Sequence, residues 1–460
     1  MISSKDLVIN ANEVIDKIEL TELEIAQLAG IDPSLENAKT VVPNVASLPP
    51  AAENKGRMIY VTDIEEYYFS DGIDWLDNFS TVYDTSSAIS EIAYAWGYNN
   101  AGRLGDDTLV DKSSPATVVG YITNWSQVSA GRFHNLGLIS DGIAYTWGEN
   151  GFGMLGDGTT VDKSSPVTVV GGITNWTQVS AGGSHSLGIT DTGVAYAWGA
   201  NGGFSGSGML GDNTTVNKSS PVTVVGGLTW SQVSAGEAHS LGISGGIAYA
   251  WGSNSRTFFG SGMLGDGTTV DKSSPVTVVG GITNWTQLSA SRVHSLGIAG
   301  GVAYAWGEGS SGRLGDNSTV DKSSPVTVVG GITNWSQVSA GEFHNLGLTS
   351  DGIAYTWGDN GSGMLGDGTT VDKSSPVTVV GGITNWSQVS AGFNHSLGVT
   401  DTGIGYAWGF NSFGRLGDGT TVNKSSPATV VGGITSWTQL SGGGSHSLGT
   451  RTNFKGFNTL

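Results

Sequence analysis

The sequence has no cysteine, few charged residues and no long apolar run. Without cysteine, the 460-residue chain can form neither a disulfide nor a thiolate metal site. Only 13% of the residues are charged, and a net charge of −19 disfavours the basic face that nucleic acid phosphates require. No stretch approaches the roughly 18 apolar residues of a membrane helix, and residues 1–6 lack the pattern of a signal peptide. We therefore expect a soluble protein with no nucleic acid partner and no membrane insertion.

Glycine and tryptophan, by contrast, are abundant, at 74 and 15 residues. Together with many valines, isoleucines and leucines, they indicate packed, turn-rich β structure. The acidic excess is uneven, since residues 1–90 carry 16 acidic and 5 basic groups and residues 91–460 carry 23 and 15. The two parts of the chain are therefore treated separately.

From residue 91 onward, a unit of about fifty residues recurs seven times. All seven histidines of the chain fall at one position of this unit: His134, His185, His239, His294, His344, His395 and His446. A Tyr-x-Trp-Gly element contributes a second series: Trp96, Trp147, Trp198, Trp251, Trp306, Trp357 and Trp408. A further tryptophan recurs before each histidine, so every tryptophan except Trp75 belongs to the repeat. Seven complete sets establish an internal repeat.

Each unit predicts four short strands, for example over residues 164–170, 176–180, 185–189 and 194–198. Four antiparallel strands per repeat are typical of a propeller blade. The last unit stops at residues 446–450, and the first begins with only the strand 91–97, which would supply the strand that the last blade lacks. We predict an all-β fold: a seven-bladed β-propeller over residues 91–450, closed by its N-terminal strand and followed by a tail, 451–460.

These motifs resemble the regulator of chromosome condensation repeat family. The matching elements are Trp147-Gly148, the loop Leu155-Gly156-Asp157-Gly158 and the strand start Ala181-Gly182-x-x-His185-Ser186. The resemblance implies the propeller fold. It leaves the function open, because nucleotide-exchange factors, enzyme inhibitors and scaffolds all share it.

Residues 1–90 contain no repeat. We predict a helical anchor over 1–32, a Pro-rich linker over 33–55 and a small β-meander over 56–80. The predicted anchoring and oligomerising residues share one helix face: Val14, Ile18, Ile25 and Leu28. The meander, with Met58, Tyr67-Tyr68 and Asp71-Gly72 before Trp75, resembles modules of phage tail fibres and other virion proteins.

The repeated polar residues predict structural roles. One histidine per blade cannot converge on a metal, so we expect each ring to bond backbone at the start of its strand. The aspartate of Leu-Gly-Asp is expected to cap a turn, with calcium binding as the alternative. Neither a nucleophile elbow, a phosphate loop nor a zinc motif is present, so we predict no catalytic residue, no metal and no cofactor.

Function is expected where the copies differ, in the pair before each histidine and in the loop after each Trp-Gly. The predicted residues for partner or receptor binding are Arg132, Phe133, Phe204, Arg256, Phe258, Phe259, Arg292, Glu342, Phe343, Phe393, Phe410 and Phe413. Residues 132–150 and 342–360 are nearly identical, but Arg132 stands where Glu342 does. Because a buried site rarely survives a reversal of charge, we expect this position to be exposed.

The leading functional hypothesis is a phage virion protein, a tail fibre, appendage or decoration. Residues 1–90 would contact other virion proteins, the propeller would bind a host surface glycan or protein, and a trimer is the favoured homo-oligomer. The alternative is a cellular or secreted scaffold that binds a protein, resembling a GTPase regulator or an inhibitor. An enzyme ranks third.

Overall fold

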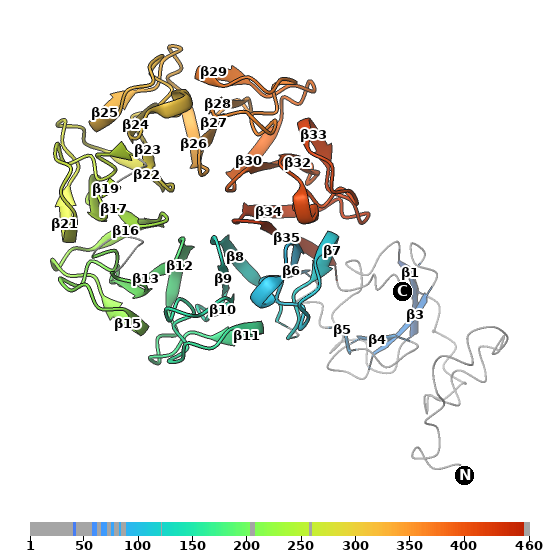
Figure 1. The fold of residues 1–460 in the computed structure, drawn as a ribbon. Coiled ribbons are helices and arrows are strands. Elements are labelled where there is room, and N and C mark those ends of the chain that lie inside the picture. The colour runs from blue at the N-terminus through green and yellow to red at the C-terminus, as the bar shows by residue number, and fades with distance from the viewer. Residues whose placement is uncertain are drawn as a thin grey trace, which may run out of the picture. The chain divides into compact units, whose positions relative to one another are not determined.

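The computed structural model describes residues 89–454, apart from 121, 203–207 and 257–259, together with five short strands that precede them (Figure 1). The chain divides into two compact units, residues Met1–Ile89 with Phe454–Leu460, and residues Ser90–Asn453. Among the described residues, no helix has the length and apolar character needed to cross a membrane.

The first unit contains one sheet in the order β1-β2-β3-β4-β5. Its strands are β1 (Thr40–Val42), β2 (Met58–Val61), β3 (Glu66–Ser70), β4 (Trp75–Asp77) and β5 (Val82–Tyr83). Strands β2 to β5 pair antiparallel in chain order, and β1 pairs parallel with β2. The anchor residues Val14, Ile18, Ile25 and Leu28 lie outside the described residues.

The second unit is a ring of seven four-stranded antiparallel sheets, which confirms the predicted propeller (Figure 1). The innermost strands are β8 (Trp125–Ala130), β12 (Trp176–Ala181), β16 (Trp230–Ala235), β22 (Trp285–Ala290), β26 (Trp335–Ala340), β30 (Trp386–Ala391) and β34 (Trp437–Gly442). The second strands are β9 (His134–Ile139), β13 (His185–Thr190), β17 (His239–Ser244), β23 (His294–Ala299), β27 (His344–Thr349), β31 (His395–Thr400) and β35 (His446–Phe454).

The outer half of each blade follows the same rule. The third strands are β10 (Ala144–Gly148), β14 (Ala195–Gly199), β18 (Ile247–Gly252), β24 (Val302–Gly307), β28 (Ala354–Gly358), β32 (Gly405–Gly409) and β6 (Ile89–Gly97). The outermost strands are β11 (Lys163–Thr168), β15 (Lys218–Thr223), β21 (Lys272–Thr277), β25 (Lys322–Thr327), β29 (Lys373–Thr378), β33 (Lys424–Thr429) and β7 (Lys112–Thr117). Short elements in the connecting loops are η3 (Asn100–Gly102), η4 (Ser310–Gly312), η5 (Ser412–Gly414), β19 (Ser255–Arg256) and β20 (Gly260–Ser261). We number the blades 1 to 7 from the one that begins with β8.

The blades are shifted by one strand from the predicted unit. The Ser-Ser-Pro strand pairs with the Trp-Gly strand that precedes it, as Tyr196 with Thr223, and becomes the outer edge of the preceding blade. Blade 7 therefore has the order β34-β35-β6-β7. The predicted closure by the N-terminal strand is confirmed, but each end of the domain supplies two strands, where the sequence indicated three and one. Because the repeat is cyclic, the sequence alone does not show which of the four strands begins a blade.

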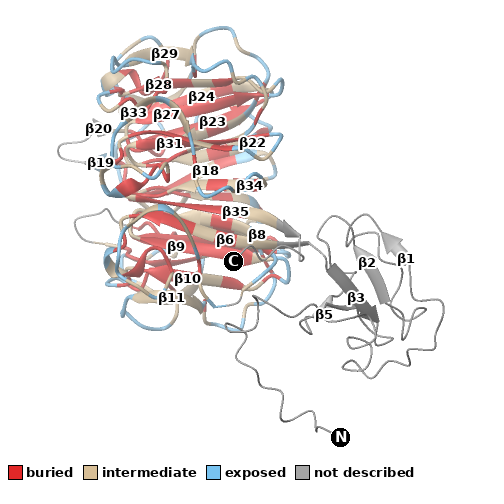
Figure 2. Cartoon of the chain, turned by 90° about the vertical axis from the view of Figure 1, so that its right-hand side faces the viewer, coloured by how far each residue is buried: buried red, intermediate tan, exposed pale blue. Residues whose placement is uncertain are grey.

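The apolar core consists of interfaces between neighbouring blades (Figure 2). Between blades 2 and 3, Leu187 and Ile189 pack with Trp230 and Val233 of the next innermost strand. A glycine faces the innermost tryptophan, because a Cβ added at Gly188 would lie 2.5 Å from the Trp176 ring. Each blade thus depends on its neighbours to bury its apolar faces.

Around the channel, the innermost strands leave one edge unpaired by any strand, and side chains of the preceding blade satisfy it. The Gln127 Oε1 atom accepts from the Val179 backbone N–H at 2.9 Å, and its Nε2 donates to the Val179 carbonyl at 3.1 Å. The Ser129 Oγ atom accepts from the Ala181 N–H at 3.0 Å. The equivalent Gln and Ser acceptor bonds are present at all seven junctions.

We call the glutamines that bond the inner edge of the next blade the ring glutamines. Replacement of one of them tests whether these bonds stabilise the propeller. Gln178→Met keeps the side-chain length but leaves the Val233 N–H and carbonyl without the bonds at 3.0 and 3.1 Å. We expect a loss of about 1–3 kcal/mol in the free energy of unfolding, measured by urea denaturation. Thr160→Ala, at an exposed loop position, serves as the control. Equal stability of the two variants would show that water replaces the glutamine at no cost.

Candidate binding face at the channel mouth

Both variable regions of the repeat lie on one face of the ring. In blade 2, His185 pairs with Gly199, so the loop that ends at the histidine and the loop that follows Trp-Gly meet at the same ends of β13 and β14. Blades 1 and 3 to 6 repeat this register, and in blade 7 the Tyr98 N–H donates to the Ser445 carbonyl at the same point. We call this surface, with these two loops of every blade, the mouth face.

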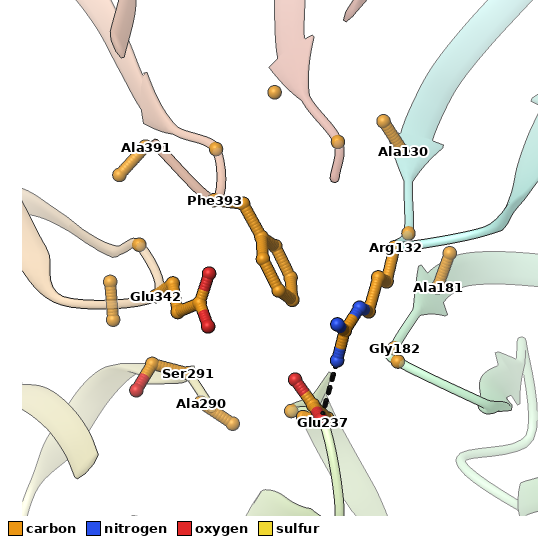
Figure 3. A pocket seen from close by; sticks show the side chains of 18 of the residues that line it. Ala130, Arg132, Ala181, Gly182, Glu237, Ala290, Ser291, Glu342, Ala391 and Phe393 are labelled. Atoms are coloured by element: carbon orange, nitrogen blue, oxygen red, sulfur yellow. Dashed lines mark hydrogen bonds and ion pairs between the residues drawn. The ribbon is translucent and has the colours of Figure 1, made fainter. Parts of the chain in front are cut away.

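A cavity of about 190 Å³ lies at the centre of the mouth face, where the seven turns between the first and second strands converge (Figure 3). Five serines of its wall also line a second cavity of about 200 Å³, bounded by the ring glutamines: Ser129, Ser289, Ser339, Ser390 and Ser441. The two cavities are therefore stacked along the channel.

Four charged side chains, from blades 1, 3, 4 and 5, line the mouth of the channel. Arg132 lies 2.7 Å from Glu237, and Arg292 contacts both Glu237, at 3.5 Å, and Glu342. Arg132 and Glu237 come from blades 1 and 3 and meet at the mouth (Figure 3). The blade between them has Gly183 at this position, where an added Cβ would lie 2.7 Å from the Glu237 side chain. The charges are balanced within the cluster, two of each sign.

The expectation that the Arg132 and Glu342 position is exposed is wrong for Glu342, which is only 6% exposed. Arg132 is half-buried. The reversal of charge is tolerated because each of the two side chains faces an opposite charge from another blade, Glu237 or Arg292. Comparison of copies pairwise could not reveal this compensation, which exists only in the closed ring.

Aromatic rings stack on the arginines of the same face. The Arg132 guanidinium lies 4.8 Å from the Phe393 ring centroid and 4.8 Å from that of Phe133. Arg292 lies 5.6 Å from the Phe343 ring. Stacking of this kind holds both partners in place while leaving ring edges available. Figure 3 shows Phe393 directed into the mouth between Glu342 and Arg132.

A second set of arginines, which the sequence prediction missed, lies outside the first. Arg103 stacks on Phe133 and Tyr98, Arg313 on Phe343 and Arg415 on Phe410. The available signal was the residue before Leu-Gly-Asp, which is arginine in three copies and methionine in the other four. Glu237, also omitted, could have been found as a charged residue in the variable pair before His239.

The remaining predicted residues are distributed differently. Phe410 is half-buried, and Phe413 is 46% exposed. Arg256 belongs to β19, which pairs with β20. Phe204, Phe258 and Phe259 lie outside the described residues.

The seven histidines are fully buried and join neighbouring blades. The His185 Nε2 atom lies 2.8 Å from Ser240 Oγ of the next blade, and Ser240 donates to the Met209 carbonyl at 2.9 Å. Trp251 Nε1 donates to the same carbonyl at 2.9 Å. The predicted structural role is thus correct, but the partner is a side chain of the adjacent blade and not backbone, because the blades approach closely there.

The repeated aspartate caps its loop, as predicted. Asp157 Oδ1 accepts from the Thr159 N–H and from Asn150 Nδ2, each at 3.0 Å, and Lys163 Nζ lies 3.4 Å from Oδ2. A lysine thus occupies the place that the calcium alternative would assign to a cation. Within the described part of the chain, no three His, Asp or Glu side chains are grouped as metal ligands.

Buried imidazoles make stability depend on pH. Desolvation lowers the pKa of His134, His294 and His344 to about 3 and that of His185 to about 4. Unfolded histidine has a pKa of about 6.5, so below that pH the unfolded state binds protons that the folded state excludes. The free energy of unfolding therefore keeps the full contribution of these histidines above about pH 6.5. As the pH is lowered below that value, it decreases by about 1.4 kcal/mol per pH unit for each histidine.

His185→Gln tests this linkage because glutamine can bond Ser240 but does not titrate. We expect the slope of unfolding free energy against pH, measured between about pH 5.5 and 4.5, to decrease by about 1.4 kcal/mol per unit. Thr160→Ala should leave the slope unchanged. A slope in His185→Gln equal to that of the parent chain would show that His185 is already protonated in the fold.

Comparison with known proteins agrees with the fold. A family model for the RCC1-like domain matches residues 92–449. The ultraviolet-B receptor UVR8 of Arabidopsis thaliana is 30% identical over 73% of this chain and 65% of its own length. The human E3 ubiquitin-protein ligase HERC2 is 29% identical over 78% of this chain and 6% of its own length.

Among solved structures, Prp20p of Saccharomyces cerevisiae superimposes with a TM-score of 0.69 at 20% identity, covering 78% of this chain and 91% of Prp20p. At that identity the likeness concerns the fold alone. The family model covers most of the chain and coincides with the seven-bladed ring. The chain therefore belongs to the RCC1-like domain family.

Proposed function

We propose that the propeller is a protein-binding or regulatory module that engages its partner through the mouth face. The observation that carries the proposal is that the recurring residues and the variable residues of the repeat have different roles. The recurring Gln, Ser, His, Trp and Asp side chains bond within the ring, as at Gln127, His185 and Trp251. Among the residues that differ between blades, by contrast, five charged or aromatic ones line one cavity: Arg132, Glu237, Arg292, Glu342 and Phe393.

The composition of the mouth face supports protein binding. Arginine and aromatic side chains dominate the energetics of protein interfaces, especially when they are held in place and partly desolvated. Arg132 with Phe393 and Arg292 with Phe343 have this arrangement. The balanced ion pairs among Arg132, Glu237, Arg292 and Glu342 also favour a specific partner over a generally charged surface.

Relatives are consistent with such a role. Prp20p is described as binding Gsp1p and histones. The ligase activity named for HERC2 is not carried over, because this chain matches 6% of that protein. A binding role thus agrees with the predicted absence of catalysis and with the scaffold alternative inferred from the sequence.

The virion hypothesis depends on residues 1–90 and on their resemblance to tail-fibre modules, and it stays a prediction. The virion hypothesis and the scaffold alternative both require binding through an exposed face of the propeller. They differ in the partner that is bound. Mass spectrometry of purified particles tests it, and absence of the chain from such particles would end it.

A double variant of the mouth face tests the proposed function. Arg132→Ala with Phe393→Ala removes a stacked pair, and Glu237 keeps Arg292 at 3.5 Å as its counter-charge, so the fold should persist. Quantitative capture from host lysate, followed by titration of the purified partner, should show at least a tenfold loss of affinity, or about 1.4 kcal/mol.

The matched control is Val194→Ser on the opposite face, in the turn between β13 and β14. This variant should capture the same partner as the parent chain. If instead the double variant binds every captured protein as tightly as the parent chain, the mouth face is not the binding surface.

A further inference from the structure

Three arginines occupy one position of the repeat, which allows their surroundings to be compared. Arg103, Arg313 and Arg415 each precede a Leu-Gly-Asp loop, and each backbone carbonyl accepts a bond from the Trp Nε1 atom of the next blade, at 3.1, 3.1 and 2.9 Å. All three are buried, with 6%, 4% and 2% of their surface exposed. Their backbone setting and depth are therefore the same.

The three differ in their counter-charges. Arg103 lies 3.4 Å from Glu149, and Arg313 lies 2.7 Å from Glu308. Arg415 forms no ion pair with any carboxylate of the described residues. Burial of a charge without a counter-charge is unfavourable, so Arg415 is the exception that requires an explanation.

Each arginine is flanked by two residues that directly follow Trp-Gly, one in its own blade and one in the next blade. The identity of these two residues decides whether the arginine has a counter-charge. These are Glu308 and Asp359 around Arg313, and Tyr98 and Glu149 around Arg103. Around Arg415 both positions are aromatic, Phe410 and Tyr98. Arg415 is thus the copy in which neither flanking position supplies a carboxylate.

The polar contacts of Arg415 are all to neutral groups. Its Nε donates to the Ser412 carbonyl at 3.3 Å and one Nη to the Gly444 carbonyl at 3.0 Å, while the Phe410 ring centroid lies 4.8 Å from the guanidinium. Desolvation lowers its pKa to about 10, which still leaves it charged at neutral pH. Gly444, whose carbonyl accepts one of these bonds, lies at the variable position of blade 7.

An exposed aromatic residue accompanies this site. Phe413 is 46% exposed, has φ of 68° and lies with its ring centroid 4.5 Å from that of Tyr98. The equivalent left-handed positions in η3 and η4 hold the small residues Ala101 and Ser311. A bulky side chain in this conformation is unfavourable, and strain of this kind is often found at binding sites.

We propose that Arg415, with Phe410 stacked on it and the Tyr98–Phe413 pair in the adjoining loops, receives an Asp or Glu side chain of the protein partner. The partner's carboxylate would supply the counter-charge that Glu308 supplies to Arg313, and it would accept a hydrogen bond from the guanidinium beside the Phe410 ring, which occupies the position equivalent to Glu308. The aromatic rings would cover the aliphatic part of that side chain. This inference rests on the proposed function, and it identifies an acidic segment as what the mouth face recognises.

The repeat itself provides the variants for a test. Arg415→Met introduces the residue found at four equivalent positions: Met154, Met209, Met263 and Met364. Because Arg415 lacks a counter-charge, we expect Arg415→Met to leave the melting temperature unchanged or to raise it. Arg313→Met, the matched control, should lower it, because Glu308 would stay buried without its partner. Equal destabilisation by both variants would overturn the inference.

Binding is measured with a polyglutamate peptide of about ten residues, by calorimetry on the full chain. We expect salt-sensitive binding that falls at least tenfold in Arg415→Met and in Phe410→Glu, which supplies an internal carboxylate. Polyglutamine should not bind. Unchanged affinity in both variants, equal binding of polyglutamine, or complete displacement of the peptide by millimolar inorganic phosphate would overturn the inference.

The outcome is distinguishable from failure of the proposed function. If a captured partner depends on Arg132 and Phe393 but not on Arg415, the mouth face is the binding surface and the acidic-segment inference is wrong. If capture depends on none of the three, the proposed function itself fails.

Discussion

The structure depends on how the inner edge of each blade is satisfied. A strand that lines a channel has hydrogen-bonding groups on one side with no neighbouring strand to receive them. In this ring, a glutamine and a serine of the preceding blade take that place, as Gln127 and Ser129 do for Val179 and Ala181. Because each junction requires the next blade, the bonds form a complete set only when the ring is closed. Gln439 and Ser441 of blade 7 complete the set by accepting from the Val128 and Ala130 N–H groups of blade 1.

This constraint accounts for both the uniformity and the variation of the repeat. Glutamine, histidine and both tryptophans recur because each makes a bond or a packing contact with an adjacent blade, as His185 does with Ser240. At the turn that faces the channel, the backbone makes the bond to the next blade, as the Arg132 N–H does to the Gly182 carbonyl. The side chain at that position makes no recurring bond, so it can vary. Charges of opposite sign can therefore occupy it in different blades, provided that they balance across the mouth, as Arg132 and Glu237 do.

The sequence predicted the architecture well because the repeat carries its own periodicity. Seven blades, four strands per blade and closure through the start of the domain could all be read from the spacing of tryptophan and histidine. The strand at which each blade begins could not be read from the sequence. The outermost strand follows a long loop, yet it pairs with the strand before that loop, as Thr223 does with Tyr196. The burial of Glu342 was also inaccessible, because its counter-charge Arg292 lies in another blade at the same repeat position. The spacing of the repeats does not reveal contacts between the same position of two different blades. The arginines before Leu-Gly-Asp were overlooked because their meaning depends on the residues that flank them in space.

Native-state hydrogen exchange tests the central claim most directly. If side chains of the neighbouring blade satisfy the inner edges, then the Val179 and Ala181 amides, and their counterparts around the channel, should exchange only through global unfolding, with the same denaturant dependence as amides of the second strands. Rapid exchange of these amides, at the rate of solvent-exposed edge groups and without denaturant dependence, would contradict the account. In that case the channel edges would be held by water, and the closed ring would have to be explained by apolar packing alone.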